Sequence, residues 1–146
     1  MDMKTGTKSA PSFSKCYTAL IGAFDPEEII FLLYMEHHTW LSNRGYPTVR
    51  SQQYHMMRMA IGRRIFKQCV DRFTHIGLLE LIVVDNSYDY ILDMRLYSKL
   101  VAILDGFKST MMARHFCDEF LNCASEKLLA DINSEMVEEW IKKQQQ

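Results

Sequence analysis

The apolar pattern of residues 26–42 predicts the first long helix of the chain. Asp25-Pro26-Glu27-Glu28 marks its start, because an aspartate cap, a proline in the first turn and a glutamate at the third position are typical of helix N-termini. Apolar side chains then occupy almost every face of this helix, from Ile29 to Leu41. We therefore expect it to be the central helix of the core.

Two further helices are predicted in the middle third of the chain. Ser51 is a good N-cap for a short helix over residues 51–59, which follows a turn that contains Gly45 and Pro47. Residues 63–75 form a longer amphipathic helix. Its apolar side chains share one face, and polar or charged side chains share the other: Arg63, Arg64, Lys67, Gln68, Asp71 and His75.

A β-hairpin follows, with its strands over residues 78–84 and 88–94. Both runs are rich in β-branched and aromatic residues, and Asp85-Asn86-Ser87 between them is turn chemistry. Gly77 is the expected end of the preceding helix. Helical spacing returns over residues 96–107.

The rest of the chain predicts a C-terminal helical extension, residues 108–146. Ser109 opens an amphipathic stripe that continues through Ala124 to Leu128, and a last helix covers residues 134–143. Such a stripe either packs on its own domain or pairs with a second subunit. The aromatic and apolar candidates for dimerisation are Phe116, Phe120, Leu121 and Trp140.

The predicted fold class is therefore mainly α with a small β-hairpin, namely a winged helix-turn-helix with a C-terminal helical extension. Residues 1–12 are polar and are expected to form a mobile arm, and residues 13–24 carry a shorter helical pattern. Residues 13–107 form the winged-helix domain. A length of 146 residues leaves no room for a second separate core.

Positive charge is concentrated on the predicted helix-turn-helix. The whole chain has a net charge of −1, yet residues 44–72 hold seven Lys and Arg and one acidic residue, which makes this segment +6. Such a cluster is suited to the phosphates of nucleic acid. The predicted DNA-binding residues are Arg50, Ser51, Gln52, Gln53, Arg58, Arg63, Arg64 and Lys67.

Four stretches together resemble a known family: Phe24–Met35, Gly45–Val49, Gly62–Val70 and Ile76–Leu81. They are similar to the winged-helix domain of plasmid and phage replication initiators, replisome organisers and related regulators, over residues 13–95. The resemblance implies that residues 63–75 are the recognition helix, with Arg63, Arg64 and Lys67 at its exposed start. It also implies that Ser51, Gln52 and Gln53 contact phosphate.

Two features depart from that family. The turn at residues 59–62 is apolar where a polar one is usual. The predicted wing carries Glu80, Asp85, Asp89 and Asp93 and has neither Lys nor Arg, so it would repel phosphate. We expect the wing to contribute little to DNA contact or to face a protein partner.

These observations favour a dimeric protein that binds double-stranded DNA in replication, partition or transcription control. The alternative is an adaptor that uses the same fold to bind another protein and does not bind DNA. An enzyme is not expected, because the chain has none of the common catalytic motifs and His55, His75 and His115 have no evident partner. His37 and His38 are neighbours on one helix and so should face different ways.

No cofactor or metal is expected. The four cysteines, Cys16, Cys69, Cys117 and Cys123, do not have zinc-site spacing and should be free thiols that pack as small apolar side chains. No apolar run reaches the roughly 18 residues of a membrane-spanning helix. Since residues 1–12 do not look like a signal peptide, we expect a cytoplasmic protein.

Overall fold

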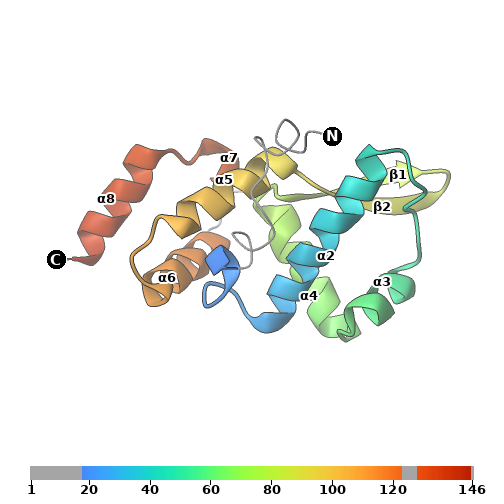
Figure 1. Ribbon diagram of the computed structural model, residues 1–146, viewed down its shortest axis with the longest axis horizontal. Coiled ribbons are helices and arrows are strands. Elements are labelled where there is room, and N and C mark those ends of the chain that lie inside the picture. The colour runs from blue at the N-terminus through green and yellow to red at the C-terminus, as the bar shows by residue number, and fades with distance from the viewer. Residues whose placement is uncertain (1–17, 123–127, 146) are drawn as a thin grey trace, which may run out of the picture.

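The computed structural model describes residues 18–122 and 128–145, and in these ranges the protein is mainly helical with one two-stranded antiparallel hairpin (Figure 1). The structure therefore confirms the prediction of a mainly α protein with a small β-hairpin. The elements are α2 (Pro26–Asn43), α3 (Gln52–Met59), α4 (Arg63–His75), β1 (Leu79–Val84), β2 (Ser87–Leu92), α5 (Met94–Asp105), α6 (Thr110–Leu121), α7 (Leu128–Asp131) and α8 (Ser134–Gln144). The expected N-terminal arm lies outside the described residues, as do Cys16, Cys123 and Ala124.

Helix α2 begins as predicted and supplies the centre of the core. The Glu28 carboxylate accepts a hydrogen bond from the Asp25 backbone N–H at 2.9 Å, which satisfies a donor that the helix leaves unpaired. Phe31 is fully buried, with its ring centroid 5.8 Å from that of Phe66 and 5.7 Å from that of Phe73 on α4. Helix α2 is not buried on every face, since the Trp40 side chain is 47% exposed.

Helices α3 and α4 meet in a turn whose apolar residues belong to the core. Ala60 adopts a left-handed conformation, with φ 58°, and Met59 and Ile61 on either side of it are buried. These buried side chains explain why the turn is apolar where a polar one was expected. Helix α4 then buries Phe66 and Phe73 and leaves its other face to solvent, as its sequence pattern predicts.

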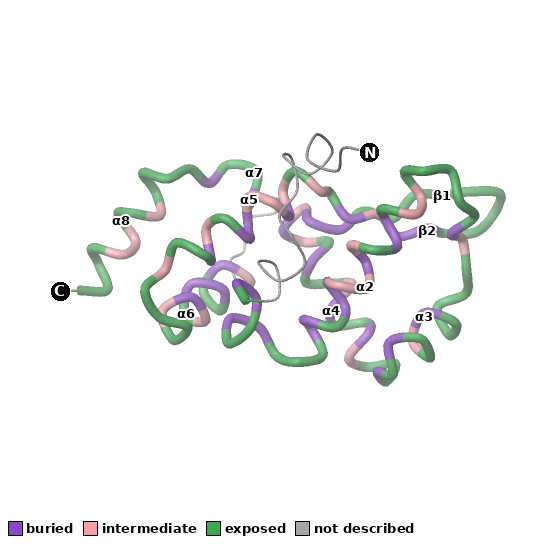
Figure 2. The backbone as a smooth tube through the Cα atoms, in the orientation of Figure 1, coloured by how far each residue is buried: buried purple, intermediate pink, exposed green. Residues whose placement is uncertain are grey.

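The turn of the hairpin contains two residues, one fewer than the three predicted from the sequence. Asp85 and Asn86 both have positive φ, 48° and 67°, and Val84 pairs with Ser87. Two left-handed residues are the requirement of a type I′ turn, which aspartate and asparagine tolerate. The base of the hairpin is buried in the core through Leu79 and Leu92, whereas its far end projects from the body (Figure 2).

The C-terminal helices pack on the same core and so favour the first of the two alternatives for this extension. Phe116 and Phe120 of α6 are each only 5% exposed, so the expectation that they form a dimer contact is wrong. Trp140 is half-buried against Phe107 and Phe116 and donates a hydrogen bond to Glu119, and Leu121 is also half-buried. All four of the side chains proposed for dimerisation are therefore buried or half-buried by other parts of the same chain.

The predicted stripe does not run on as one helix. Helix α6 ends at Leu121, and residue 128 begins the separate short helix α7. Helix α8 follows at the end of the molecule farthest from α3 (Figure 1). Cys69 and Cys117 are buried free thiols, as expected. No helix among the described residues is long and apolar enough to span a membrane.

The docking of α6 on the residues before α2 can be tested at a glycine. Gly22 has φ +83°, and a Cβ there would lie 2.8 Å from the Cβ of Thr110, whereas Gly45 has φ +85° and open space around it. Gly45→Ala should therefore lower the free energy of unfolding by roughly 1–2 kcal/mol from backbone strain alone. Gly22→Ala should lower it by about 1–3 kcal/mol more through overpacking. Equal decreases in urea unfolding would contradict this docking.

Candidate functional site

The N-terminal half of α4 presents the predicted cations to solvent. Arg63, Arg64 and Lys67 are all exposed, on the face opposite the buried Phe66 and Phe73. The Lys67 ammonium lies 3.6 Å from the Asp71 carboxylate, in an ion pair whose two side chains are both mostly exposed. Such a pair is weak, so it leaves Lys67 available to another anion.

Two other cations of the segment are withdrawn from this surface. The Arg72 guanidinium lies 2.5 Å from the Glu28 carboxylate, which ties α4 to the start of α2. The Arg44 guanidinium stacks over the Trp40 ring at 4.2 Å. Fewer cations are therefore available on this surface than the seven counted in residues 44–72.

The predicted residues at the start of α3 have different roles. The Ser51 hydroxyl caps the helix by accepting from the Tyr54 backbone N–H at 3.1 Å. The Gln52 amide donates to the Tyr90 hydroxyl at 2.9 Å. Ser51 thus caps α3 as the sequence predicts, and Gln52 ties α3 to β2, which the sequence did not indicate. Gln53 is exposed.

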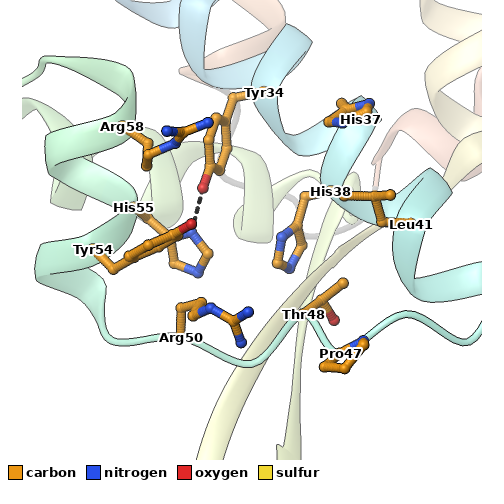
Figure 3. A pocket seen from close by; sticks show the side chains of 10 residues that line it. All are labelled: Tyr34, His37, His38, Leu41, Pro47, Thr48, Arg50, Tyr54, His55 and Arg58. Atoms are coloured by element: carbon orange, nitrogen blue, oxygen red, sulfur yellow. Dashed lines mark hydrogen bonds between the residues drawn. The ribbon is translucent and has the colours of Figure 1, made fainter.

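Arg50 and Arg58 line a polar pocket between α2, the segment before α3 and α3 itself (Figure 3). The pocket has a volume of about 160 Å³ and is open on one side. The side chains that line it are Tyr34, His37, His38, Leu41, Pro47, Thr48, Arg50, Tyr54, His55 and Arg58. Most of them carry hydrogen-bonding groups, and two carry a permanent positive charge.

A buried carboxylate lies beneath this pocket. Asp89 of β2 is 3% exposed and accepts hydrogen bonds from the His38 ring at 2.7 Å, the Thr48 hydroxyl at 2.8 Å and the Tyr90 backbone N–H at 3.0 Å. Asp89 is therefore not an acid on the wing surface, contrary to the prediction. Asp93 is also used internally, because its carboxylate caps α5. The exposed acids of the hairpin are Glu80 and Asp85.

His55 has a partner that was missed in the sequence. Its Nδ1 lies 2.8 Å from the Tyr34 hydroxyl, and its ring centroid lies 5.0 Å from that of His38. Burial, and then the neighbouring His38, lower the pKa of His55 to about 4, so its ring is neutral at pH 7. The exposed His37 instead stacks on Trp40. The one available clue was the four-residue spacing of Tyr34 and His38, which places both on one face of α2.

The described residues hold no group of three or more histidine, cysteine or carboxylate side chains that could bind a metal. The exposed cationic side chains are suited to an anion. The structure divides the predicted cations into an outward set on α4 and a pocket set, Arg50 and Arg58. These two sets are the candidate sites.

The low pKa of His55 predicts a specific decrease of stability in acid. Unfolded histidine binds a proton below about pH 6.5, whereas folded His55 stays neutral to about pH 4. The free energy of unfolding should therefore fall as pH drops from 6.5 to 4. His55→Gln should flatten this slope, because it removes the group whose pKa is lowered. Parallel slopes for wild type and His55→Gln in urea unfolding would contradict the assignment.

Comparisons with protein-family models, curated proteins and solved structures return no match to this chain. The resemblance to winged-helix replication proteins therefore stays a prediction from the sequence pattern. Function has to be inferred from the residues of the two candidate sites.

Proposed function

We propose that this protein is a cytoplasmic DNA-binding protein that inserts the start of α4 into the major groove of double-stranded DNA. The observation that carries this proposal is the exposure of Arg63, Arg64 and Lys67 on one side of a helix whose other side is buried. In helix-turn-helix proteins, the N-terminal residues of the second helix contact the base edges. The order of α2, α3, α4 and the hairpin is that of a winged helix-turn-helix.

The local geometry of α4 supports this choice. Its 13 residues give a rod of about 20 Å, and a B-DNA major groove about 12 Å wide admits one helix. The helix N-terminus also carries a partial positive charge, which adds to that of the side chains. Gln53 on the exposed side of α3 is a neutral donor that would suit a backbone phosphate.

The hairpin supports a different role from that of a DNA-contacting wing. Glu80 and Asp85 are exposed on it, together with apolar side chains that include Val83, 70% exposed, and Tyr88, 59% exposed. Phosphate would be repelled by the acids, whereas an apolar and acidic surface suits a protein. This observation keeps the adaptor function as the second candidate.

The proposal includes a homodimer, because one copy presents only three outward cations on α4. Two copies related by two-fold symmetry would read half-sites about 34 Å apart. Since Phe116 and Phe120 are buried, a second copy has to use other side chains. Met111, 81% exposed at the start of α6, and Met136, 41% exposed on α8, are apolar candidates. The process served would be replication, partition or transcription control.

Replacing Arg63, Arg64 and Lys67 together by Gln should abolish binding to genomic DNA fragments while leaving the fold intact. All three side chains lie on the solvent side of α4, so their replacement removes charge without disturbing the core. For each phosphate that the variant no longer neutralises, the slope of log K against log salt should become shallower by about one unit. Fluorescence anisotropy over a range of salt concentrations measures both effects.

A matched control removes the same charge elsewhere. Lys108, between α5 and α6, and Lys142 and Lys143, on α8, are exposed, and their joint replacement by Gln changes the net charge by the same amount. This control should retain DNA affinity within about threefold, since exposed charges beyond a Debye length are screened. If both triple variants lose affinity equally, or neither does, α4 is not the DNA-binding element.

A further inference from the structure

The polar pocket has two arginines whose charge no described residue neutralises. Among the residues that the structure describes, neither Arg50 nor Arg58 forms an ion pair. Arg50 donates to the carbonyl of its own neighbour, Val49, and lies 5.6 Å over the Tyr54 ring. The two arginines line the pocket from different segments, Arg50 before α3 and Arg58 on it, and the Arg58 guanidinium lies beside the Tyr34 ring (Figure 3). Both arginines are exposed residues, so an anion from solution can reach them.

Both cations act on the same wall of the pocket. Burial raises the pKa of the Tyr34 hydroxyl, and the charges of Arg58 and Arg50 oppose that rise. Each guanidinium therefore lies close enough to Tyr34 for its charge to be felt there. Both arginines also line the same pocket.

The carboxylate nearest to the pocket cannot serve as the missing anion. Asp89 already accepts from His38, Thr48 and a backbone N–H. It is buried beneath the pocket and is not one of the side chains that line it. Asp89 therefore orients His38 and Thr48, and the two guanidinium groups are left for a ligand.

His55 adds a neutral donor. Its ring is uncharged at pH 7, and its Nδ1 shares a hydrogen bond with the Tyr34 hydroxyl; in the tautomer that accepts this bond at Nδ1, the ring proton is on Nε2. Nε2 has no hydrogen-bond partner among the described residues. A donor of this kind beside two guanidinium groups suits an acceptor-rich anion.

We propose that this pocket binds the phosphate group of a small phosphate monoester, held by Arg50 and Arg58 with His55 as a further donor. The guanidinium fork matches phosphate oxygens in geometry as well as in charge. The volume of the pocket is large enough for a phosphate group. A cavity of about 150 Å³ holds benzene, which has six heavy atoms, whereas a phosphate group has five. The open side of the pocket leaves room for the organic part of the ligand.

This site is separate from the surface proposed to bind DNA. The pocket is concave and walled by α2 and α3, whereas Arg63, Arg64 and Lys67 project from the start of α4. A phosphate group could also come from the DNA backbone, so the test has to separate the two sources. Phosphate binding in the pocket does not depend on DNA binding at α4.

Calorimetric titration of the full chain with inorganic phosphate at neutral pH, against chloride at equal ionic strength, tests the proposal. Wild type should bind phosphate at one site. Arg50→Gln and Arg58→Gln should each weaken binding about tenfold, the effect of removing one charge-assisted hydrogen bond. Arg95→Gln is the matched control, because it makes the same charge change at an exposed arginine of α5 outside the pocket, and it should bind within about twofold of wild type. Circular dichroism confirms that each variant is folded.

Three outcomes would overturn the proposal. Wild type binds no phosphate at millimolar concentration; Arg95→Gln weakens binding as much as the pocket variants; or a short DNA duplex displaces phosphate from the pocket, which would assign the pocket to the DNA backbone. DNA binding is measured separately, by fluorescence anisotropy of the triple variant of α4, so its failure can be told apart from failure of phosphate binding in the pocket. Phosphate binding that depends on Arg50 and Arg58 and persists beside bound duplex supports the proposal.

Discussion

The hydrogen bonds of Asp89 join three parts of the fold at one buried carboxylate. Asp89 belongs to β2, His38 to α2 and Thr48 to the segment that leads into α3. A buried carboxylate is costly unless its oxygens are satisfied, so each donor has to stay in place while the protein is folded. The hairpin, the central helix and the approach to α3 are thereby held at fixed positions relative to one another.

Both candidate sites depend on that arrangement. Helix α3 is further held by the Ser51 cap and by the Gln52 amide on Tyr90, so the pocket between α2 and α3 has rigid walls. Helix α4 buries Phe66 and Phe73 against Phe31, and this leaves Arg63, Arg64 and Lys67 on the outside. The outward cations are therefore a consequence of how the aromatic core is filled.

The sequence predicted the features that depend on neighbouring residues. The starts of α2, α3 and α6 follow from the local caps at Asp25, Ser51 and Ser109, and the hairpin follows from Asp85-Asn86. These signals act over three or four residues, so a pattern along the chain contains them. The exposure of the α4 cations was predictable for the same reason.

Interactions between residues far apart in the sequence were not predictable. His38 and Asp89 are 51 positions apart, and Arg72 and Glu28 are 44 positions apart, so no local pattern indicates that they pair. The sequence pattern of α6 indicates an apolar face, but it does not indicate which residues pack against that face. A second subunit was therefore a possible partner for Phe116 and Phe120. The division of the cations between α4 and the pocket likewise emerges only in three dimensions.

The proposed function requires that DNA is contacted by the start of α4 and not by the hairpin. Amide chemical shifts of the ¹⁵N-labelled full chain, followed during titration with a DNA duplex, test this residue by residue. We expect the largest shifts at Arg63, Arg64 and Lys67, with small shifts at Val83 and Asp85. Dominant shifts at the tip of the hairpin, or no shifts at α4, would contradict DNA binding through α4.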